Sequence, residues 1–326
     1  MNGVLVIDKP AGPTSHDVVA CVRRATGWAK VGHTGTLDPM ATGVLPLVVG
    51  RATRLAQFLS ATDKVYEAEV RLGWATDTYD AEGTRMEPNP AEAGSPRVEV
   101  PGPTDALDSI SVRTGASAPA RTDWPAADDL DRILDHFRGS YVQVAPPFSA
   151  KKTDGVRAYS LAREGRPIEP KGSPVTVHEV SCIARDGDRL RLRIRCSAGF
   201  YVRSFAHELG VSLGVGAHLS ALRRTKSGDF EAADAVPLEL VEREGQAAVA
   251  RLVPIDRLLA SMPAVVVTEE GAARTRHGND LRPEDLISRP DALPGRVRVV
   301  DEQGVLLAIG APSGKPGLLH PGIVVV

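Results

Sequence analysis

One carboxylate stands almost alone in the stretch GHTGTLDPMATGVLP, residues 32–46. Asp38 is its only acid, and His33 is its only other ionisable side chain. The three glycines of this stretch let the backbone approach a large or anionic partner closely. A lone carboxylate suits nucleophilic chemistry, whereas glycoside hydrolysis would need a second acid near by. Because Pro39 follows directly, Asp38 could instead simply begin a turn or cap a helix.

The motifs of most cofactor-dependent enzymes are missing from the sequence. There is no Gly-x-Gly-x-x-Gly after a strand, no Walker loop and no Gly-x-Ser-x-Gly. The eight histidines form no pair at helical or zinc-finger spacing, and the three cysteines are far apart. We therefore expect chemistry that uses neither a cofactor nor a metal ion.

Composition indicates a globular protein with a real core. Of the 326 residues, 42% are hydrophobic and 25% are charged. No run of eighteen apolar residues could span a membrane, and the first residues do not resemble a secretory signal. An odd number of distant cysteines suits a reducing compartment. We expect a cytoplasmic protein without a membrane partner.

The near-neutral net charge hides an uneven distribution. Residues 139–228 contain 15 basic and 7 acidic side chains, whereas residues 86–129 contain 3 and 8. One strongly basic block suggests an anionic partner on one face, although chance clustering on a solvated surface is the alternative.

The elements that must position Asp38 follow from local patterns. Residues 3–10 form a short apolar run ended by Lys-Pro, which predicts a buried strand. Residues 14–27 begin with a Thr/Ser cap and end at a glycine, which predicts a helix. Residues 65–74 alternate between apolar and polar side chains, which predicts a half-exposed strand with Tyr66 on its apolar face.

The middle of the chain changes character at residues 86–126. This segment is rich in proline and poor in aromatic residues, so we expect a flexible insertion. Residues 128–139 predict a helix capped by Gly139. Residues 188–199 predict a strand with four arginines on one face, which bind an anion or pair with acids. A helix is expected over 205–214, and short strand signals dominate after a boundary near 255–264.

Four blocks of the chain resemble the TruB family of pseudouridine synthases. GHTGTLDPMATGVLP resembles the signature loop of that family, and VLVIDKPAGPTSHD resembles its N-terminal strand. The other blocks run over residues 64–83, 143–165 and 196–230, in the order of the family. Together they cover most of residues 3–85 and 130–232, and the 86–126 segment interrupts none of them.

The resemblance implies a fold and a function. It implies an α/β (α+β) catalytic domain over residues 1–258, with a mixed, largely antiparallel sheet, and a small PUA-like β-barrel over residues 262–326. The implied activity is isomerisation of a uridine in the T-loop of tRNA, at position 55. A guide-RNA-dependent synthase of the dyskerin type and a non-catalytic tRNA-folding protein are the alternatives.

The resemblance also assigns roles to individual residues. Asp38 would be the catalytic aspartate, which could attack the sugar, attack the base or take the C2′ proton. Arg203 would pair with Asp38, and Tyr66 would stack on the target base. The residues implied to bind the base or the RNA backbone are His33, Tyr66, Tyr201, Leu222, Lys9, Lys151 and Arg223. Several have plain alternatives: Arg203 could be a surface residue, and Leu222 could belong to a helix core.

The implied partner is tRNA. The catalytic domain would bind the T-arm stem-loop, from which the target uridine must be extruded. The C-terminal domain would reach the acceptor end. We expect a monomer that needs no other protein.

Overall fold

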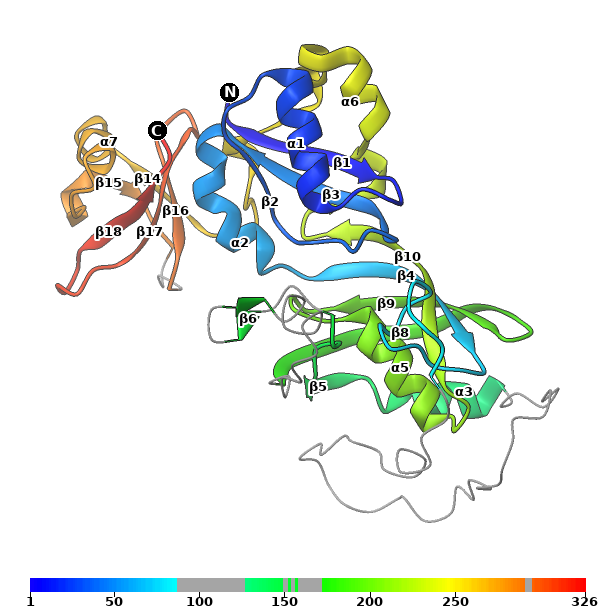
Figure 1. The fold of residues 1–326 in the computed structure, drawn as a ribbon. Helices are drawn as coiled ribbons and strands as arrows, with labels where there is room; N and C mark the ends of the chain where they lie inside the picture. The colour runs from blue at the N-terminus through cyan, green and yellow to red at the C-terminus, as the bar shows by residue number, and fades with distance from the viewer. Residues whose placement is uncertain (87–126, 149–151, 154–155, 158–171, 291–294) are drawn as a thin grey trace. The chain divides into compact units, whose positions relative to one another are not determined.

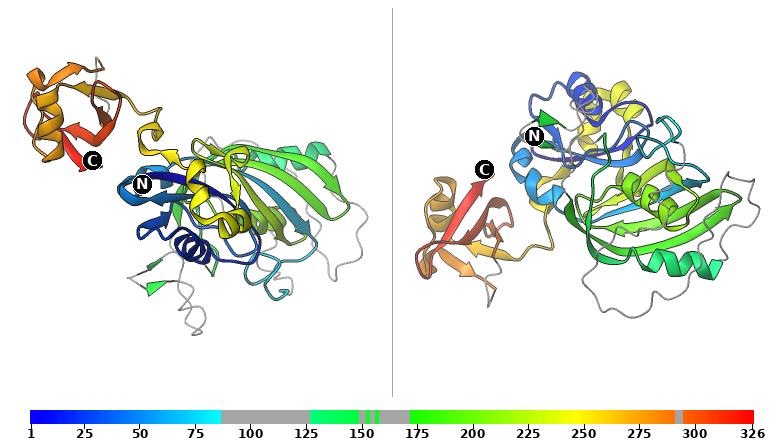
Figure 2. Two further views of the ribbon diagram at one scale, coloured as in Figure 1. Left: turned by 90° about the horizontal axis from the view of Figure 1, so that it is seen from above. Right: turned by 60° about the horizontal axis from the view of Figure 1, so that its bottom comes forward.

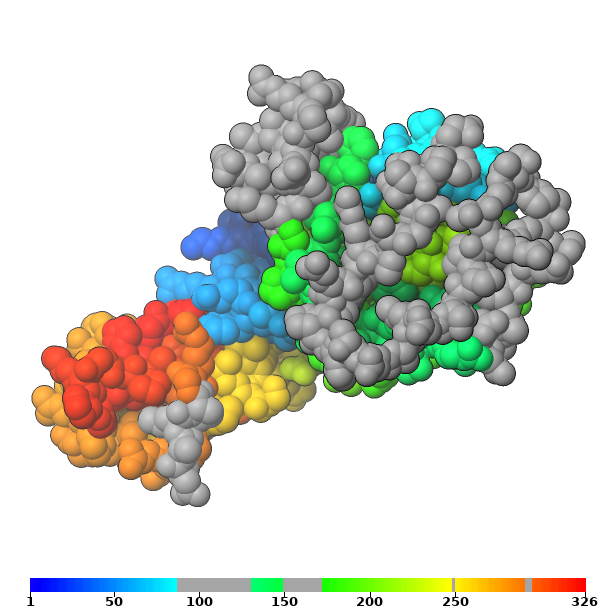
Figure 3. Space-filling model, turned by 90° about the horizontal axis from the view of Figure 1, so that it is seen from below, coloured from blue at the N-terminus to red at the C-terminus, as the bar shows by residue number. Residues whose placement is uncertain are grey.

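A computed structural model describes residues 1–86, 127–148, 152–153, 156–157, 172–290 and 295–326, and the other residues are drawn in grey in Figure 1 and in the space-filling view of Figure 3. The predicted insertion at 86–126 therefore lies outside the described residues, except for Met86. Lys151 also lies outside them. Backbone contacts divide the chain into two units. Unit 1 comprises Met1–Thr62 and Lys226–Val326, and unit 2 comprises Asp63–Thr225.

Unit 1 begins with the predicted strand and helix. In chain order, its elements up to residue 257 are β1 Gly3–Lys9, α1 Ser15–Thr26, β2 Val31–His33, β3 Thr42–Val49, the 3-10 helix Gly50–Leu55, α2 Ala56–Ser60, β11 Phe230–Glu231, the 3-10 helix Ala232–Asp234, β12 Val236–Pro237, α6 Leu238–Glu244, the 3-10 helix Gly245–Arg251, β13 Val253–Pro254 and the 3-10 helix Ile255–Arg257. Strand β1 pairs antiparallel with β3 and β13 and parallel with β12. Strand β2 pairs antiparallel with β3.

Helix α1 forms where the sequence places its start and stop signals. Thr14 accepts a hydrogen bond from the backbone N–H of Asp17, and the Asp17 carboxylate accepts one from the backbone N–H of Thr14, which completes a capping box. Gly27 ends the helix in the left-handed conformation, at φ 73°.

The C-terminal part of unit 1 forms its own five-stranded sheet. Its elements are β14 Ala264–Val267, α7 Glu269–Arg276, the 3-10 helix Pro283–Asp285, β15 Leu286–Ser288, β16 Val297–Val300, β17 Leu306–Pro312 and β18 Leu319–Val324. The strand order is β15-β14-β16-β17-β18, and a turn closed by a hydrogen bond from the Gly304 N–H to the Asp301 carbonyl lies between β16 and β17. The division at residues 258 and 262, and the PUA-like character of this segment, stay predictions.

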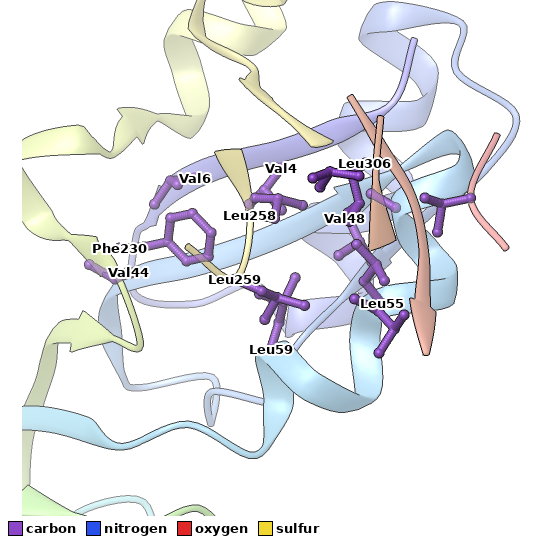
Figure 4. Close-up of a cluster of buried hydrophobic side chains, with 14 residues drawn as sticks. Val4, Val6, Val44, Val48, Leu55, Leu59, Phe230, Leu258, Leu259 and Leu306 are labelled. Atoms are coloured by element: carbon purple, nitrogen blue, oxygen red, sulfur yellow. The ribbon is translucent and has the colours of Figure 1, made fainter. Parts of the chain in front are cut away.

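One hydrophobic core joins both ends of the chain within unit 1 (Figure 4). Side chains of β1, β3 and α2 pack in one cluster with Leu258 and Leu259, and with residues of the C-terminal sheet. The C-terminal members of this cluster are Val300, Leu306, Ile309 and Val325. The C-terminal sheet therefore shares apolar contacts with the N-terminal strands.

Unit 2 is built on a sheet with the strand order β10-β4-β9-β8-β5. Its elements are β4 Lys64–Leu72, α3 Ala127–Asp135, β5 Gly139–Gln143, β6 Lys152–Thr153, β7 Val156–Arg157, β8 Ser173–Asp186, β9 Arg189–Cys196, α5 Val202–Ser212 and β10 Ala217–Ser227, of which the last two residues belong to unit 1. The β4–β9, β8–β9 and β5–β8 pairs are antiparallel. With the parallel β1–β12 and β14–β16 pairs, the expected mixed, largely antiparallel α/β fold is confirmed.

Helices α3 and α5 lie on one face of the unit 2 sheet (Figure 2). Phe205 of α5 is fully buried and meets Phe137 edge-on, at 4.9 Å between ring centroids. The start of α5 and the end of α3 differ from the predictions. Helix α5 begins at Val202 rather than at residue 205. Gly139 does not cap α3, because the helix ends at Asp135 and a turn leads to Gly139, which begins β5 at φ 96°.

The arginine face of β9 pairs largely with acids. Arg189 contacts Glu69 at 2.7 Å, and Arg195 contacts Asp63 at 3.4 Å and Glu179 at 3.3 Å. These pairs are well exposed to solvent, and each contributes little to stability. The anionic neighbours of this row are thus acids of the chain itself. In the described parts of the chain, no helix is long and apolar enough to cross a membrane.

Candidate active site

Asp38 lies in the loop between β2 and β3, in unit 1. The residue before it, Leu37, is buried, and its backbone is held at both polar atoms. The Ser15 hydroxyl accepts from the Leu37 N–H at 2.9 Å and donates to the Leu37 carbonyl at 3.1 Å. The first turn of α1 thereby fixes the backbone immediately before the half-exposed carboxylate.

Lys9 fixes the other side of the same loop. Its ammonium group donates to the carbonyls of Pro10 at 2.9 Å, Pro39 at 3.1 Å and Ala41 at 2.7 Å. The residue is fully buried, and an ammonium group withdrawn from water requires such acceptors. The side chain therefore supports the Asp38 loop from inside, whereas the expected contact between Lys9 and RNA stays a prediction.

His33 is a half-buried residue at the end of β2. Its ring meets the ring of His16 edge-on, with 5.1 Å between the centroids and 82° between the planes. His16 is exposed in the first turn of α1, so two imidazoles lie on the part of unit 1 that holds Asp38.

Arg203 is a buried residue in the first turn of α5, in unit 2. Its guanidinium donates to the carbonyls of Thr78 at 3.1 Å and Phe148 at 3.0 Å. It also forms an ion pair with Asp80 at 3.4 Å, in which both side chains are only 7% exposed. The alternative interpretation of Arg203 as a surface arginine is therefore wrong.

The predicted binding residues of unit 2 lie on β4, on β10 and immediately before α5. Tyr66 is buried on β4, and Leu222 is buried on the neighbouring strand β10 rather than in a helix core. Tyr201 immediately precedes α5, and the Gln143 amide holds its backbone: it accepts from the Tyr201 N–H at 2.8 Å and donates to its carbonyl at 3.1 Å. Arg223, on β10, is half-buried.

Glu208, the acid of α5, has an unusual environment. Burial raises the pKa of Glu208 to about 7. Among the described residues, neither Glu208 Oε2 nor the Tyr141 hydroxyl has a hydrogen-bond partner. Burial and the nearby Glu208 charge raise the pKa of Tyr141 as well. Burial therefore favours a neutral Glu208 at moderately acid pH.

Asp80 and Gln143 were missed as supporting residues by the sequence analysis. Both are polar residues with less than a tenth of their surface exposed. The segment TDTYD, residues 76–80, offered a signal, because two threonines next to acids often form side-chain hydrogen bonds within a turn. Thr78 does donate to Asp80 at 2.7 Å. Gln143 gave no comparable signal.

Comparison with known proteins agrees with this architecture. The description "TruB family pseudouridylate synthase (N terminal domain)" matches residues 23–99 and 104–202, and "tRNA pseudouridylate synthase B C-terminal domain" matches residues 203–264. A tRNA pseudouridine synthase B of Solibacter usitatus is 44% identical over 99% of this chain and 100% of its own length. One of Azoarcus sp. is 42% identical over 87% of this chain and 85% of its own.

Solved structures show the same fold. A Cbf5–Nop10–Gar1 complex contains a chain with a TM-score of 0.66 and 25% identity, over 95% of this chain and 78% of that one. An H/ACA RNP bound to a substrate RNA contains one with a TM-score of 0.69 and 23% identity, over 99% and 85%. The sequence matches extend over most of the chain, and this protein belongs to the TruB family of pseudouridylate synthases.

Proposed function

We propose that this protein isomerises a uridine in the T-loop of tRNA to pseudouridine, without a cofactor, a guide RNA or another protein. The full-length similarity to tRNA pseudouridine synthase B, 44% over 99% of the chain, supports this assignment. The Cbf5 chain, which was solved in a complex, is only 25% identical. That difference favours a stand-alone tRNA enzyme over a guide-dependent one.

The reaction is an isomerisation, so its atoms and electrons balance internally. The bond between N1 and C1′ breaks, a bond between C5 and C1′ forms, C5 loses a proton and N1 gains one. Asp38 is the proposed catalytic group, by attack on the sugar, by attack on the base or by removal of the C2′ proton. Each route requires an ionised carboxylate at a fixed position. The hydrogen bonds of Ser15 and Lys9 to the loop backbone provide that fixation.

Residues of unit 2 would hold the extruded base. Tyr66 offers a ring for stacking, while Tyr201 and Leu222 offer further apolar surface. Arg203 would place its positive charge beside the carboxylate of Asp38 and stabilise the ionised form. Its own contacts with Thr78, Asp80 and Phe148 orient the guanidinium in advance.

The RNA backbone would be bound by cations and imidazoles around these groups. His33 and Arg223 are the proposed contacts among the described residues, and Lys151 is a further one from the sequence. Phosphate contacts offset the few kcal/mol that extrusion of a base costs. The C-terminal segment, residues 262–326, would contact the acceptor end of tRNA.

The test is a turnover assay with the purified chain alone. The substrate is an isolated T-arm stem-loop of about 17 nucleotides carrying tritium at uridine C5, because a stem-loop presents its target partly unstacked. We expect tritium release from one uridine. A guide-dependent enzyme would release none from this substrate, and a tRNA-folding protein would bind it and leave every uridine unchanged.

A further inference from the structure

Two aromatic rings stack next to the contacts that Arg203 makes with Thr78 and Asp80. The ring of Tyr79 lies parallel to that of His207, with 3.9 Å between the centroids and 8° between the planes. His207 follows Arg203 by four residues on α5, so both side chains project from the same face of the helix. The two neighbours of Tyr79 in the chain, Thr78 and Asp80, both contact the Arg203 guanidinium.

Tyr79 adopts a backbone conformation that residues with a Cβ atom rarely take. Its φ is 66°, in the left-handed region. The chain reverses there, and this reversal allows the residues on both sides of Tyr79 to reach one guanidinium. The backbone at Tyr79 is also held by hydrogen bonds, from its N–H to the Thr76 carbonyl at 3.2 Å and from the Leu219 N–H to its carbonyl at 3.0 Å.

We propose that Tyr79 and His207 form a positioning pair for Arg203. The stack holds the reversal at Tyr79 in place, and the reversal keeps the Thr78 carbonyl and the Asp80 carboxylate on the guanidinium. Residues 78–80 thus contact two successive turns of α5: Asp80 pairs with Arg203, and Tyr79 stacks on His207. The inference rests on the proposed function, in which Arg203 acts on the same nucleotide as Asp38.

Substitutions at Tyr79 separate backbone strain from ring stacking. Tyr79→Phe keeps the ring, Tyr79→Ala removes the ring and keeps the Cβ atom, and Tyr79→Gly removes both. If the stack only stabilised the fold, glycine would relieve the left-handed strain and retain activity. If the stack positions Arg203, the glycine variant folds and turns over slowly.

The first readout is kinetic, with the T-arm stem-loop as substrate. We expect Tyr79→Phe to stay within about twofold of wild type, whereas Tyr79→Gly loses about tenfold to a hundredfold in kcat, with KM changed less than about threefold. His207→Ala should show the same loss, and His207→Phe, which keeps a ring, should restore most of it. The exposed His136 serves as the matched control, since His136→Ala should not change kcat.

The double variant tests whether the two residues act as one unit. Tyr79→Gly combined with His207→Ala should be no slower than either single variant, because both remove the same stack. Losses that multiply would overturn the pairing. Wild-type kcat in Tyr79→Gly would overturn the positioning role.

A second readout does not depend on activity. The Arg203 Nε–H resonance in ¹⁵N-labelled protein, assigned by its loss in Arg203→Lys, should shift or broaden in Tyr79→Gly and stay in place in Tyr79→Phe. An unchanged resonance in the glycine variant would contradict the inference even if the turnover assay failed. Absence of product from the wild-type chain, by contrast, would contradict the proposed function.

Discussion

At the scale of single residues, the proposed reactive side chains of the candidate site are held in place by other residues. Asp38 is half-exposed in its loop, while Lys9 and Ser15 hold the backbone on either side of it. Arg203 is buried and held by two carbonyls and one carboxylate. Reactive groups that are preorganised in this way need little rearrangement when charge develops.

Replacing Asp38 by asparagine tests the proposed catalytic group. Asp38→Asn keeps the shape of the side chain and removes its charge, so tritium release should fall below detection. Binding of the stem-loop, measured by filter retention, should stay within about threefold, since phosphate contacts dominate affinity. The same exchange at the exposed Asp229 should change neither property. Product at a rate near that of wild type would remove Asp38 from the catalytic role.

Arg203→Lys tests the geometry of the guanidinium. A lysine ammonium keeps the charge near Asp80 but cannot reach the Thr78 and Phe148 carbonyls with the same fork of donors. We expect a loss of about a hundredfold in single-turnover rate, from misplacement of the charge. Because Asp80 keeps a cationic neighbour, the melting temperature should fall less than in Arg203→Met. Equal melting temperatures for the two variants would argue against the Asp80 ion pair.

At the scale of elements, helix α5 connects the proposed site to the core of unit 2. Its start is fixed by Gln143 through the backbone of Tyr201, its first turn presents Arg203, and its apolar face packs into the core through Phe205. Glu208 follows on the same helix with a raised pKa. The helix therefore couples the position of the arginine to the packing of the unit.

The raised pKa of Glu208 predicts a pH-dependent stability. The folded chain holds its proton up to about pH 7, whereas the unfolded chain releases it near the ordinary value of 4.5. The free energy of unfolding should therefore fall as pH rises between these values, and the full decrease should be present above about pH 7. Glu208→Gln, which stays neutral, should exceed wild type by about 1–3 kcal/mol at about pH 8 and match it near pH 4.5.

Urea denaturation at the two pH values measures this difference. Glu239→Gln, an exposed exchange on α6, is the control and should show no pH-dependent difference from wild type. A Glu208→Gln variant that is less stable than wild type at both pH values would contradict the inference that the ionised, buried Glu208 destabilises the fold.

At the scale of the whole molecule, the two ends of the chain share one core. Val4 and Val48 of the N-terminal strands belong to the same cluster as Leu306 and Val325. The segment proposed to reach the acceptor end of tRNA is thus also part of the hydrophobic interior of unit 1. Its role in RNA binding has to be tested by surface substitution, because removal has a structural cost.

Truncation after about residue 260 should therefore impair folding. It removes Val300, Leu306, Ile309 and Val325 from the core, each worth about 1.5–3 kcal/mol of burial. The total is comparable to the whole stability of about 5–15 kcal/mol that is typical of a domain. We expect the truncated chain to lose its cooperative thermal transition or to aggregate. A sharp transition near that of the full-length chain would show that the shared core contributes little.

The ionic-strength dependence of RNA binding is a second property of the whole molecule. If phosphate contacts carry most of the affinity, the logarithm of the binding constant should fall linearly with the logarithm of the salt concentration. Arg223→Ala should make this slope shallower by about 0.7–0.9. The exposed Arg276→Ala, measured on the stem-loop without an acceptor end, should leave the slope unchanged.

Local sequence signals determined several parts of this protein. The Thr14–Asp17 capping box and Gly27 set the limits of α1, and strict alternation set the faces of β4 and β9. The isolated Asp38 among glycines and prolines marked the candidate site. The family resemblance then supplied the fold and the activity. These signals act between residues close in the chain, so a single sequence displays them directly.

Other features were decided only by the tertiary structure. Lys9 is turned inward onto the Asp38 loop, Arg203 meets Thr78 from 125 positions away, and the C-terminal strands share the core of the first ones. Each of these outcomes depends on which distant backbone oxygen or side chain the packing brings within reach. A buried charge takes whatever partner the fold provides, and no local pattern in the sequence specifies that partner.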